Sequence, residues 1–172
     1  RRMSVAEMMR RMSDLGWEIG LHGSIESAHT PGLLQAQKRQ IEEAVGGEIR
    51  STRQHFLVYD AAVTPDLQAA AGFSSDSTLG FSRSIGFRAS TAHPFWCWSH
   101  RRGEALPLLE IPMQIMDEAL FRSPAVRSSE AEAIRDCLAM MDSVQRVGGC
   151  LTLNWHPHSI ADERQFRIFA AL

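Results

Sequence analysis

The sequence has 172 residues, of which 44% are hydrophobic and 22% are charged, and its formal net charge is -2. A chain of this length can bury a core as one domain, and its charge gives no basic footprint for nucleic acid or an anionic membrane. It has no apolar run of the roughly 18 residues that a membrane-spanning helix needs. Three widely spaced cysteines without a CxxC pair argue against a disulfide framework.

Helix start and stop signals mark several stretches of the chain. Capping boxes, Pro at a first turn and Gly just after an apolar stripe are the signals used. They predict helices over 4–16, 30–46, 64–72 and 129–148, and a last helix from about Ser159 through Phe169.

Short apolar or β-rich runs separate these helices. We expect strands at Trp17–Leu21, Thr52–Val58, Ile85–Arg88, Leu108–Ile111 and Cys150–Trp155. Strands that alternate with helices indicate βα units and a parallel sheet. The sequence therefore predicts an α/β fold, organised as a single domain over residues 1–172.

Histidines stand at or near the ends of three of these runs, at His22, His55 and His156. In α/β proteins, ligands bind at the carboxyl ends of strands. Histidine can bind a metal or move protons near neutral pH. The three together favour a functional site, although each alone is more often a satisfied or solvent-facing side chain.

Three further residues are candidates for substrate binding. Asp76 lies among hydroxyls and glycines, which suits a polar loop, and Arg88 offers a forked donor to a carboxylate or sugar hydroxyl. Trp155 can stack on a sugar face. An Asx-type turn, a structural ion pair and plain core packing are the alternatives. The remaining loop histidines, among them His158, have little indication of a direct role.

The order of several segments resembles the polysaccharide deacetylases, which are metal-dependent hydrolases of the carbohydrate esterase type. Gly16-Trp17-Glu18-Ile19-Gly20-Leu21-His22 is similar to the family's "GHEIG-x-H" segment. Arg53 stands at the family's arginine motif, and Leu153-Asn154-Trp155-His156 is similar to its late "L-x-x-H" motif. The stretch 72–91 and the segment 108–112 resemble a subgroup found with bacterial polysaccharide biosynthesis.

This resemblance implies a distorted (β/α) barrel and a divalent metal, with zinc favoured, held by one aspartate and two histidines. A metal of this kind polarises the acetyl carbonyl and activates water, and a protonated histidine then gives the amine its proton. By analogy, His22 is a metal ligand and His156 is the acid. Arg53 orients the aspartate base, and His55 lies at the same mouth of the barrel and has a catalytic role.

The sequence departs from the family pattern in two places. It has no Asp-Asp pair, which in the family supplies the base and one metal ligand. Four residues after His22, where the family has its second histidine, stands Glu26, and His29 is seven residues away. Glu26 can bind a metal through oxygen, or it can be a solvated loop residue. We expect the barrel to lack its first strand or strands and this piece alone to be inactive.

Three functions are compatible with these residues. The leading one is a hydrolase that removes acetyl groups from N- or O-acetylated sugars, acting on carbon–nitrogen but not peptide bonds. The alternatives are a non-catalytic carbohydrate-binding or scaffold relative without the metal, and a hydrolase of C–N bonds in small molecules. The expected partner is a carbohydrate, with no nucleic acid and no membrane span. The sequence does not determine the oligomeric state. It also does not determine whether the protein is in the cytoplasm or the cell envelope.

Overall fold

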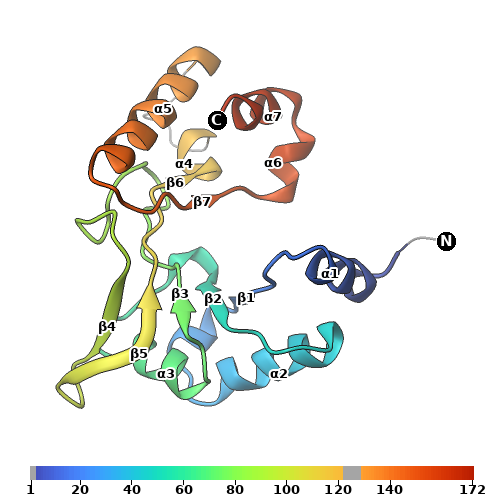
Figure 1. Cartoon of the computed structure of the whole chain (residues 1–172), viewed down its shortest axis with the longest axis vertical. Coiled ribbons are helices and arrows are strands. Elements are labelled where there is room, and N and C mark those ends of the chain that lie inside the picture. The colour runs from blue at the N-terminus through green and yellow to red at the C-terminus, as the bar shows by residue number, and fades with distance from the viewer. Residues whose placement is uncertain (1–2, 122–128) are drawn as a thin grey trace. The chain divides into compact units, whose positions relative to one another are not determined.

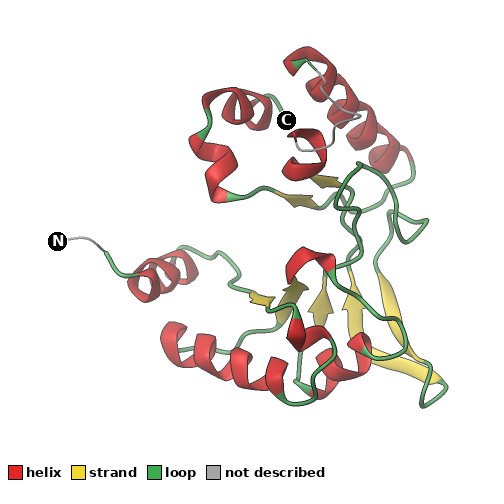
Figure 2. Cartoon of the chain, turned by 180° about the vertical axis from the view of Figure 1, so that it is seen from behind, coloured by secondary structure: helices red, strands yellow, loops and turns green. Residues whose placement is uncertain are grey.

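The computed structural model describes residues 3–121 and 129–172. The chain forms two compact units (Figures 1 and 2). The first unit consists of the described residues up to Thr78 together with Trp96–Glu110, and the second of Leu79–Phe95 and the described residues from Ile111 to Leu172. Among the described residues, no helix is long and apolar enough to cross a bilayer.

A five-stranded sheet organises the first unit. Its order is β1-β2-β3-β5-β4, and β1, β2, β3 and β5 run parallel to one another. The strands are β1 (Leu21–Gly23), β2 (Ser51–Gln54), β3 (Ser75–Asp76), β4 (Phe95–Ser99) and β5 (Glu104–Glu110). The four-residue turn between the neighbours β4 and β5 is too short for a parallel crossover, so these two strands form a hairpin.

Helices connect β1 to β2 and β2 to β3, as the alternation in the sequence predicts. They are α2 (Leu33–Val45), preceded by the 3₁₀ turn η1 (Glu26–Ala28), and α3 (Thr64–Ala70), preceded by the 3₁₀ turn η2 (His55–Leu57), while α1 (Val5–Asp14) precedes β1. Helices α2 and α3 lie side by side along the sheet (Figure 1). The buried core includes Leu21, Leu34, Ile49, Phe73, Cys97, Leu106 and Leu108. The α/β class with a mostly parallel sheet is therefore confirmed.

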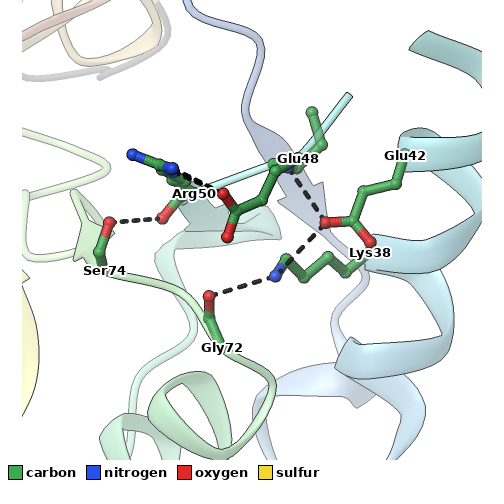
Figure 3. A network of polar contacts seen from close by, with 7 residues as sticks. Lys38, Glu42, Glu48, Arg50, Gly72 and Ser74 are labelled. Carbon is green, nitrogen blue, oxygen red and sulfur yellow. Dashed lines mark hydrogen bonds and ion pairs between the residues drawn. The ribbon is translucent and has the colours of Figure 1, made fainter. Parts of the chain in front are cut away.

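The only lysine of the chain helps to close this core. Lys38 on α2 is 8% exposed. Its Nζ donates to the carbonyl of Gly72 at 3.2 Å and lies 3.4 Å from the Glu42 carboxylate (Figure 3). The same carboxylate accepts a hydrogen bond from the backbone N–H of Ile49 at 3.1 Å. Lys38 thus ties α2 to the segment that leads into β3.

The second unit is built on a short parallel pair, β6 (Ile115–Met116) and β7 (Leu153–Asn154). Helices α4 (Asp117–Phe121), α5 (Glu130–Arg146) and α7 (Glu163–Ala170) lie on one side of this pair (Figure 2). Helix α6 (Pro157–Ala161) precedes α7. Ile115, Leu120 and Cys137 form the buried core, and Trp155 packs against it.

The capping signals located several helix ends correctly. Ser4 with Glu7, and Ser129 with Glu132, form the expected capping boxes, and Gly46 ends α2 in a left-handed conformation. The start of α2 at Thr30 was wrong: the helix begins at Leu33, and the left-handed Gly32 is its N-cap. The last helix is two helices, because Asp162 has extended backbone and caps α7.

Several expected strands differ from the observed ones. No strand covers 85–88, because Gly86 has φ +145° and its N–H bonds to the Gln114 carbonyl. The strand expected over Thr52–Val58 ends at Gln54, because Phe56 and Leu57 adopt positive φ angles. The polar loop expected around Asp76 is wrong, because Ser75–Asp76 forms strand β3 in the middle of the sheet.

Candidate functional site

Polar side chains gather at the carboxyl ends of the parallel strands in the first unit. The register places His22 of β1 opposite Arg53 of β2, and Asp76 of β3 opposite Glu110 of β5. Because the strands are parallel, their carboxyl ends meet at one edge of the sheet. His22, Arg53 and Asp76, which the sequence singles out, therefore stand at the same edge.

His22 is oriented by a backbone carbonyl. Its side chain is exposed, and Nδ1 lies 3.0 Å from the Arg53 carbonyl oxygen, which can only accept. Nδ1 therefore carries the proton, and Nε2 presents its lone pair. Nε2 lies 2.9 Å from Nδ1 of His55, the first residue of η2. A metal-binding histidine commonly has this arrangement, with one nitrogen donating to a carbonyl and the other facing the metal.

Arg53 is held at the next strand by Ser77. Its Nε donates to the Ser77 carbonyl at 3.1 Å and to the Ser77 hydroxyl at 3.0 Å. Burial lowers the pKa of the guanidinium, and the negative charges of Asp76 and Glu110 oppose that shift. An arginine stays protonated under such a shift, so Arg53 brings a fixed positive charge to this edge of the sheet.

Asp76 and Glu110 form a buried carboxyl pair. They are 1% and 0% exposed and interact through their side chains. The Thr78 hydroxyl donates to Asp76 Oδ1 at 2.6 Å and accepts from the Gln54 backbone N–H at 3.0 Å. Burial is the largest influence on Asp76 and raises its pKa. Because two buried neighbouring carboxylates repel each other when both are ionised, the state in which they share one proton is favoured.

The neighbouring thiol and phenol stay protonated. Burial raises the pKa of the Cys97 thiol to about 12, and the charges of Glu110 and Asp76 act in the same direction. Burial likewise raises the pKa of Tyr59. A nucleophilic cysteine needs a thiolate near neutral pH, so Cys97 is a buried structural residue.

Glu26, the other predicted metal ligand, is exposed on η1. Within the described residues, its carboxylate is not part of a three-ligand group with His22 and His55. Its role as a ligand stays a prediction.

A second polar cluster occupies the carboxyl ends of β6 and β7 in the second unit. Asp117, which directly follows β6, is 0% exposed. Its Oδ1 lies 2.6 Å from His156 Nδ1, and its Oδ2 accepts from the His156 backbone N–H at 2.7 Å. The Asp117 carboxylate therefore holds both the backbone and the ring of His156.

The charge of Asp117 is well supported despite its burial. Desolvation alone would raise the pKa of this carboxyl, but hydrogen bonds from Ser159 and from the backbone and ring of His156 together lower it. An ionised, buried carboxylate fixes the tautomer of its histidine and stabilises the imidazolium. His156 Nδ1 then carries the proton of this bond, and Nε2 is the nitrogen available to a ligand.

His158 joins these two residues. Its ring stacks on that of His156 at 5.2 Å between centroids. Asp117, His156 and His158 are, in the part of the chain that the structure describes, the only three acidic, histidine or cysteine residues whose ligand atoms all lie within 4.8 Å of one another. One carboxylate and two imidazoles are a donor set that zinc accepts, so this group can hold a metal as well as move a proton.

The other predicted substrate-binding residues lie in the second unit. Arg88 donates to the Gly80 carbonyl at 3.2 Å. Trp155 packs between aromatic neighbours, with ring centroids 6.1 Å from Phe121 and 5.4 Å from Phe169. This is the core packing that was the alternative for Trp155. Direct contact of Asp76, Arg88 or Trp155 with a sugar stays a prediction.

Sequence reasoning missed Asp117, Glu110 and the place of His158. Asp117 follows the apolar pair Ile115–Met116 at the point where a strand ends, which is the signal that drew attention to the histidines. Glu110 ends the apolar run of β5 in the same way. The sequence suggests a loop for His158, but Pro157 starts helix α6 and carries His158 with it.

Comparison with solved structures identifies the fold. No protein-family model matches the chain, and no curated protein sequence is significantly similar to it. A protein assigned as a polysaccharide deacetylase from Mycobacterium smegmatis superposes with a TM-score of 0.60 at 23% identity, over 96% of this chain and 60% of the other. One from Pseudomonas aeruginosa PAO1 gives 0.65 at 15% identity, over 95% and 54%.

The structure of Puue allantoinase is similar as well, with a TM-score of 0.68 at 16% identity over 96% of this chain and 54% of the other. The chain thus spans between 54% and 60% of the length of these proteins. Over that length, it has the fold of the polysaccharide deacetylase and allantoinase structures.

Proposed function

We propose that the chain is part of a metal-dependent hydrolase that removes acetyl groups from N- or O-acetylated sugars. The observation that carries the proposal is the pair of Asp117 and His156 at the carboxyl ends of β6 and β7, in a fold shared with polysaccharide deacetylases. Removal of an acetyl group from an amine requires a group that protonates the leaving nitrogen. His156 is the residue best prepared for this task.

Three features support His156 as the acid. Its ring is fixed by the Asp117 carboxylate at 2.6 Å, which leaves Nε2 for the substrate. Its side chain is 30% exposed, so a ligand can reach it, whereas the Asp117 side chain is 0% exposed. The negative charge of Asp117 stabilises the imidazolium that must form before the proton is given away.

The expected divalent metal, with zinc favoured, fits the donors at His22. The Arg53 carbonyl fixes Nδ1 as the protonated nitrogen and leaves Nε2 for coordination. A bound metal would polarise the acetyl carbonyl and lower the pKa of its water. Arg53 would hold a carboxylate base through its fixed charge, and His55 would line the same edge of the sheet.

Acetate release tests the proposal. The complete gene product is incubated with N-acetylglucosamine oligomers and added zinc or cobalt, and acetate is measured. We expect His156→Ala and Asp117→Asn to lower kcat by at least about a hundredfold, the lower end of the range for a lost proton-transfer group. His93→Ala, on an exposed loop, serves as the matched control. If no acetate is released and the purified protein contains no metal, the proposed enzymatic activity is refuted.

A hydrolase of C–N bonds in small molecules is the second candidate. The similarity to the allantoinase structure, at a TM-score of 0.68, favours it. A panel of small cyclic amides and ureides, assayed beside the acetylated sugars, separates the two. Binding of acetylated oligosaccharides without turnover of any substrate would instead indicate the non-catalytic relative.

A further inference from the structure

His55 lies where a second nitrogen ligand is needed. We propose that His22 Nε2 and His55 Nδ1 together bind a divalent cation of the zinc class, so that His55, and not Glu26, provides the second imidazole of the metal site. This inference rests on the proposed metal-dependent hydrolase and names the ligands of its metal.

The distance between the two nitrogens suits a shared cation. Nε2 of His22 and Nδ1 of His55 are 2.9 Å apart, and their rings meet edge to face with centroids 5.0 Å apart. Two nitrogens at about 2.05 Å from one metal lie about 2.9 Å apart at a right angle and about 3.3 Å apart in a tetrahedron. The pair therefore needs only a small opening to accept the ion.

His22 and His55 can bind a cation while both imidazole rings stay neutral. His22 Nδ1 donates to the Arg53 carbonyl, so its Nε2 accepts from His55 Nδ1–H in the neutral pair. When a cation binds, the proton of His55 moves from Nδ1 to Nε2, which is the other neutral tautomer. Both coordinating nitrogens then present lone pairs, and the carbonyl of Arg53 keeps His22 in place.

The backbone after His55 is built to hold this ring. Phe56 and Leu57 have φ angles of 54° and 55°, a region that bulky residues rarely adopt. The Phe56 ring packs on the His55 ring at 4.4 Å, and Leu57 is 5% exposed and anchors the turn. Backbone strain of this kind persists where the surrounding structure imposes it, often at functional sites. Here the strained turn redirects the chain so that His55 meets His22.

Glu26 has no comparable arrangement. It is exposed on η1, and in the described part of the chain it forms no three-ligand group with the two histidines. Spacing along the sequence suggested Glu26, because it stands four residues after His22. The contact to His55, 33 residues away, is visible only in the fold.

Cobalt titration tests the site. Co²⁺ is added to the metal-free complete gene product, and binding is followed by the visible absorption of the protein-bound ion and by competition with Zn²⁺. We expect His22→Ala and His55→Ala each to weaken binding at least tenfold, with little further loss in the double variant. Glu26→Ala and the matched control His29→Ala should bind within twofold of the unaltered protein. Binding by His55→Ala at the unaltered affinity, or loss on Glu26→Ala equal to that on His22→Ala, would overturn the proposal.

Two further measurements keep the result unambiguous. The double variant His156→Ala/His158→Ala removes the other possible metal group, and its retained binding assigns the ion to His22 and His55. If this double variant loses binding, the proposal fails. Zn²⁺ should also shift the ¹⁵N resonances of His22 Nε2 and His55 Nδ1, which a purely structural role would leave unchanged.

Metal bound through both histidines without acetate release would support this site while the deacetylase proposal fails. Acetate release that needs His22 but survives His55→Ala with metal retained would do the reverse.

Discussion

The buried pair of Asp76 and Glu110 should make the stability of the protein depend on pH. Asp76 is 1% exposed and Glu110 is 0% exposed on neighbouring strands, and burial raises the pKa of Asp76 above its ordinary value of 3.8. A carboxyl whose pKa is raised by folding binds its proton more tightly in the folded state. Its contribution to stability is therefore full below pH 3.8 and is lost as pH rises through the raised pKa.

Replacing Asp76 by asparagine should remove this dependence. The Asn oxygen can still accept from the Thr78 hydroxyl, and its amide can donate to the Glu110 carboxylate without titrating. Two ionised carboxylates at about 5 Å, the spacing of neighbouring strands, repel by about 3 kcal/mol at an effective dielectric constant of about 20. Arg53 offsets part of this repulsion, so we expect Asp76→Asn to gain roughly 1–2 kcal/mol relative to the unaltered protein as pH rises from 3.8 through the raised pKa of Asp76.

Urea unfolding at a series of pH values from 3.8 upward measures this difference. Asp136→Asn on α5, where the Asp136 side chain is 44% exposed, is the matched control and should change little across the series. If Asp76→Asn has the same effect on the free energy of unfolding at every pH of the series, the two carboxyl groups do not share a proton and the reasoning is refuted.

Three substitutions probe packing and capping through the midpoint of urea unfolding. In Gly23→Ala, the new Cβ would lie 2.6 Å from Gln54 Oε1, and we expect a loss of about 1–3 kcal/mol, whereas an unchanged midpoint would show that this edge relaxes freely. Leu108→Ala empties a fully buried position and should cost about 2–5 kcal/mol, so a loss below about 1 kcal/mol would contradict the core described above. Ser129→Ala removes the capping box with Glu132 and should cost about 1 kcal/mol, and an unchanged midpoint would show that this cap does not stabilise α5.

Local signals predicted the local features of this fold well. Capping boxes at Ser4 and Ser129 and the left-handed Gly46 could be read from the sequence because each depends on residues within four positions. The alternation of helices with short runs predicted the parallel sheet for a similar reason. Histidines at the ends of such runs pointed to the carboxyl edges of the strands, since the end of an apolar run is itself a local feature.

The contacts that complete the candidate sites could not be predicted in this way. Asp117 meets His156 across 39 residues, and His22 meets His55 across 33. Neither spacing carries a signal along the chain. The turn that redirects the backbone at Phe56 contains no glycine to announce its positive φ. The family pattern, which has its second histidine four residues after the first, instead pointed to Glu26.

The burial of Lys38 has a consequence for chemical labelling. It is the only lysine in the sequence, it is 8% exposed, and its amine is engaged by Gly72 and Glu42. Amine-directed reagents such as activated esters therefore meet no accessible lysine on the folded surface. Reaction at Lys38 requires α2 to separate from the segment before β3, so its rate of modification reports how often this part of the protein opens.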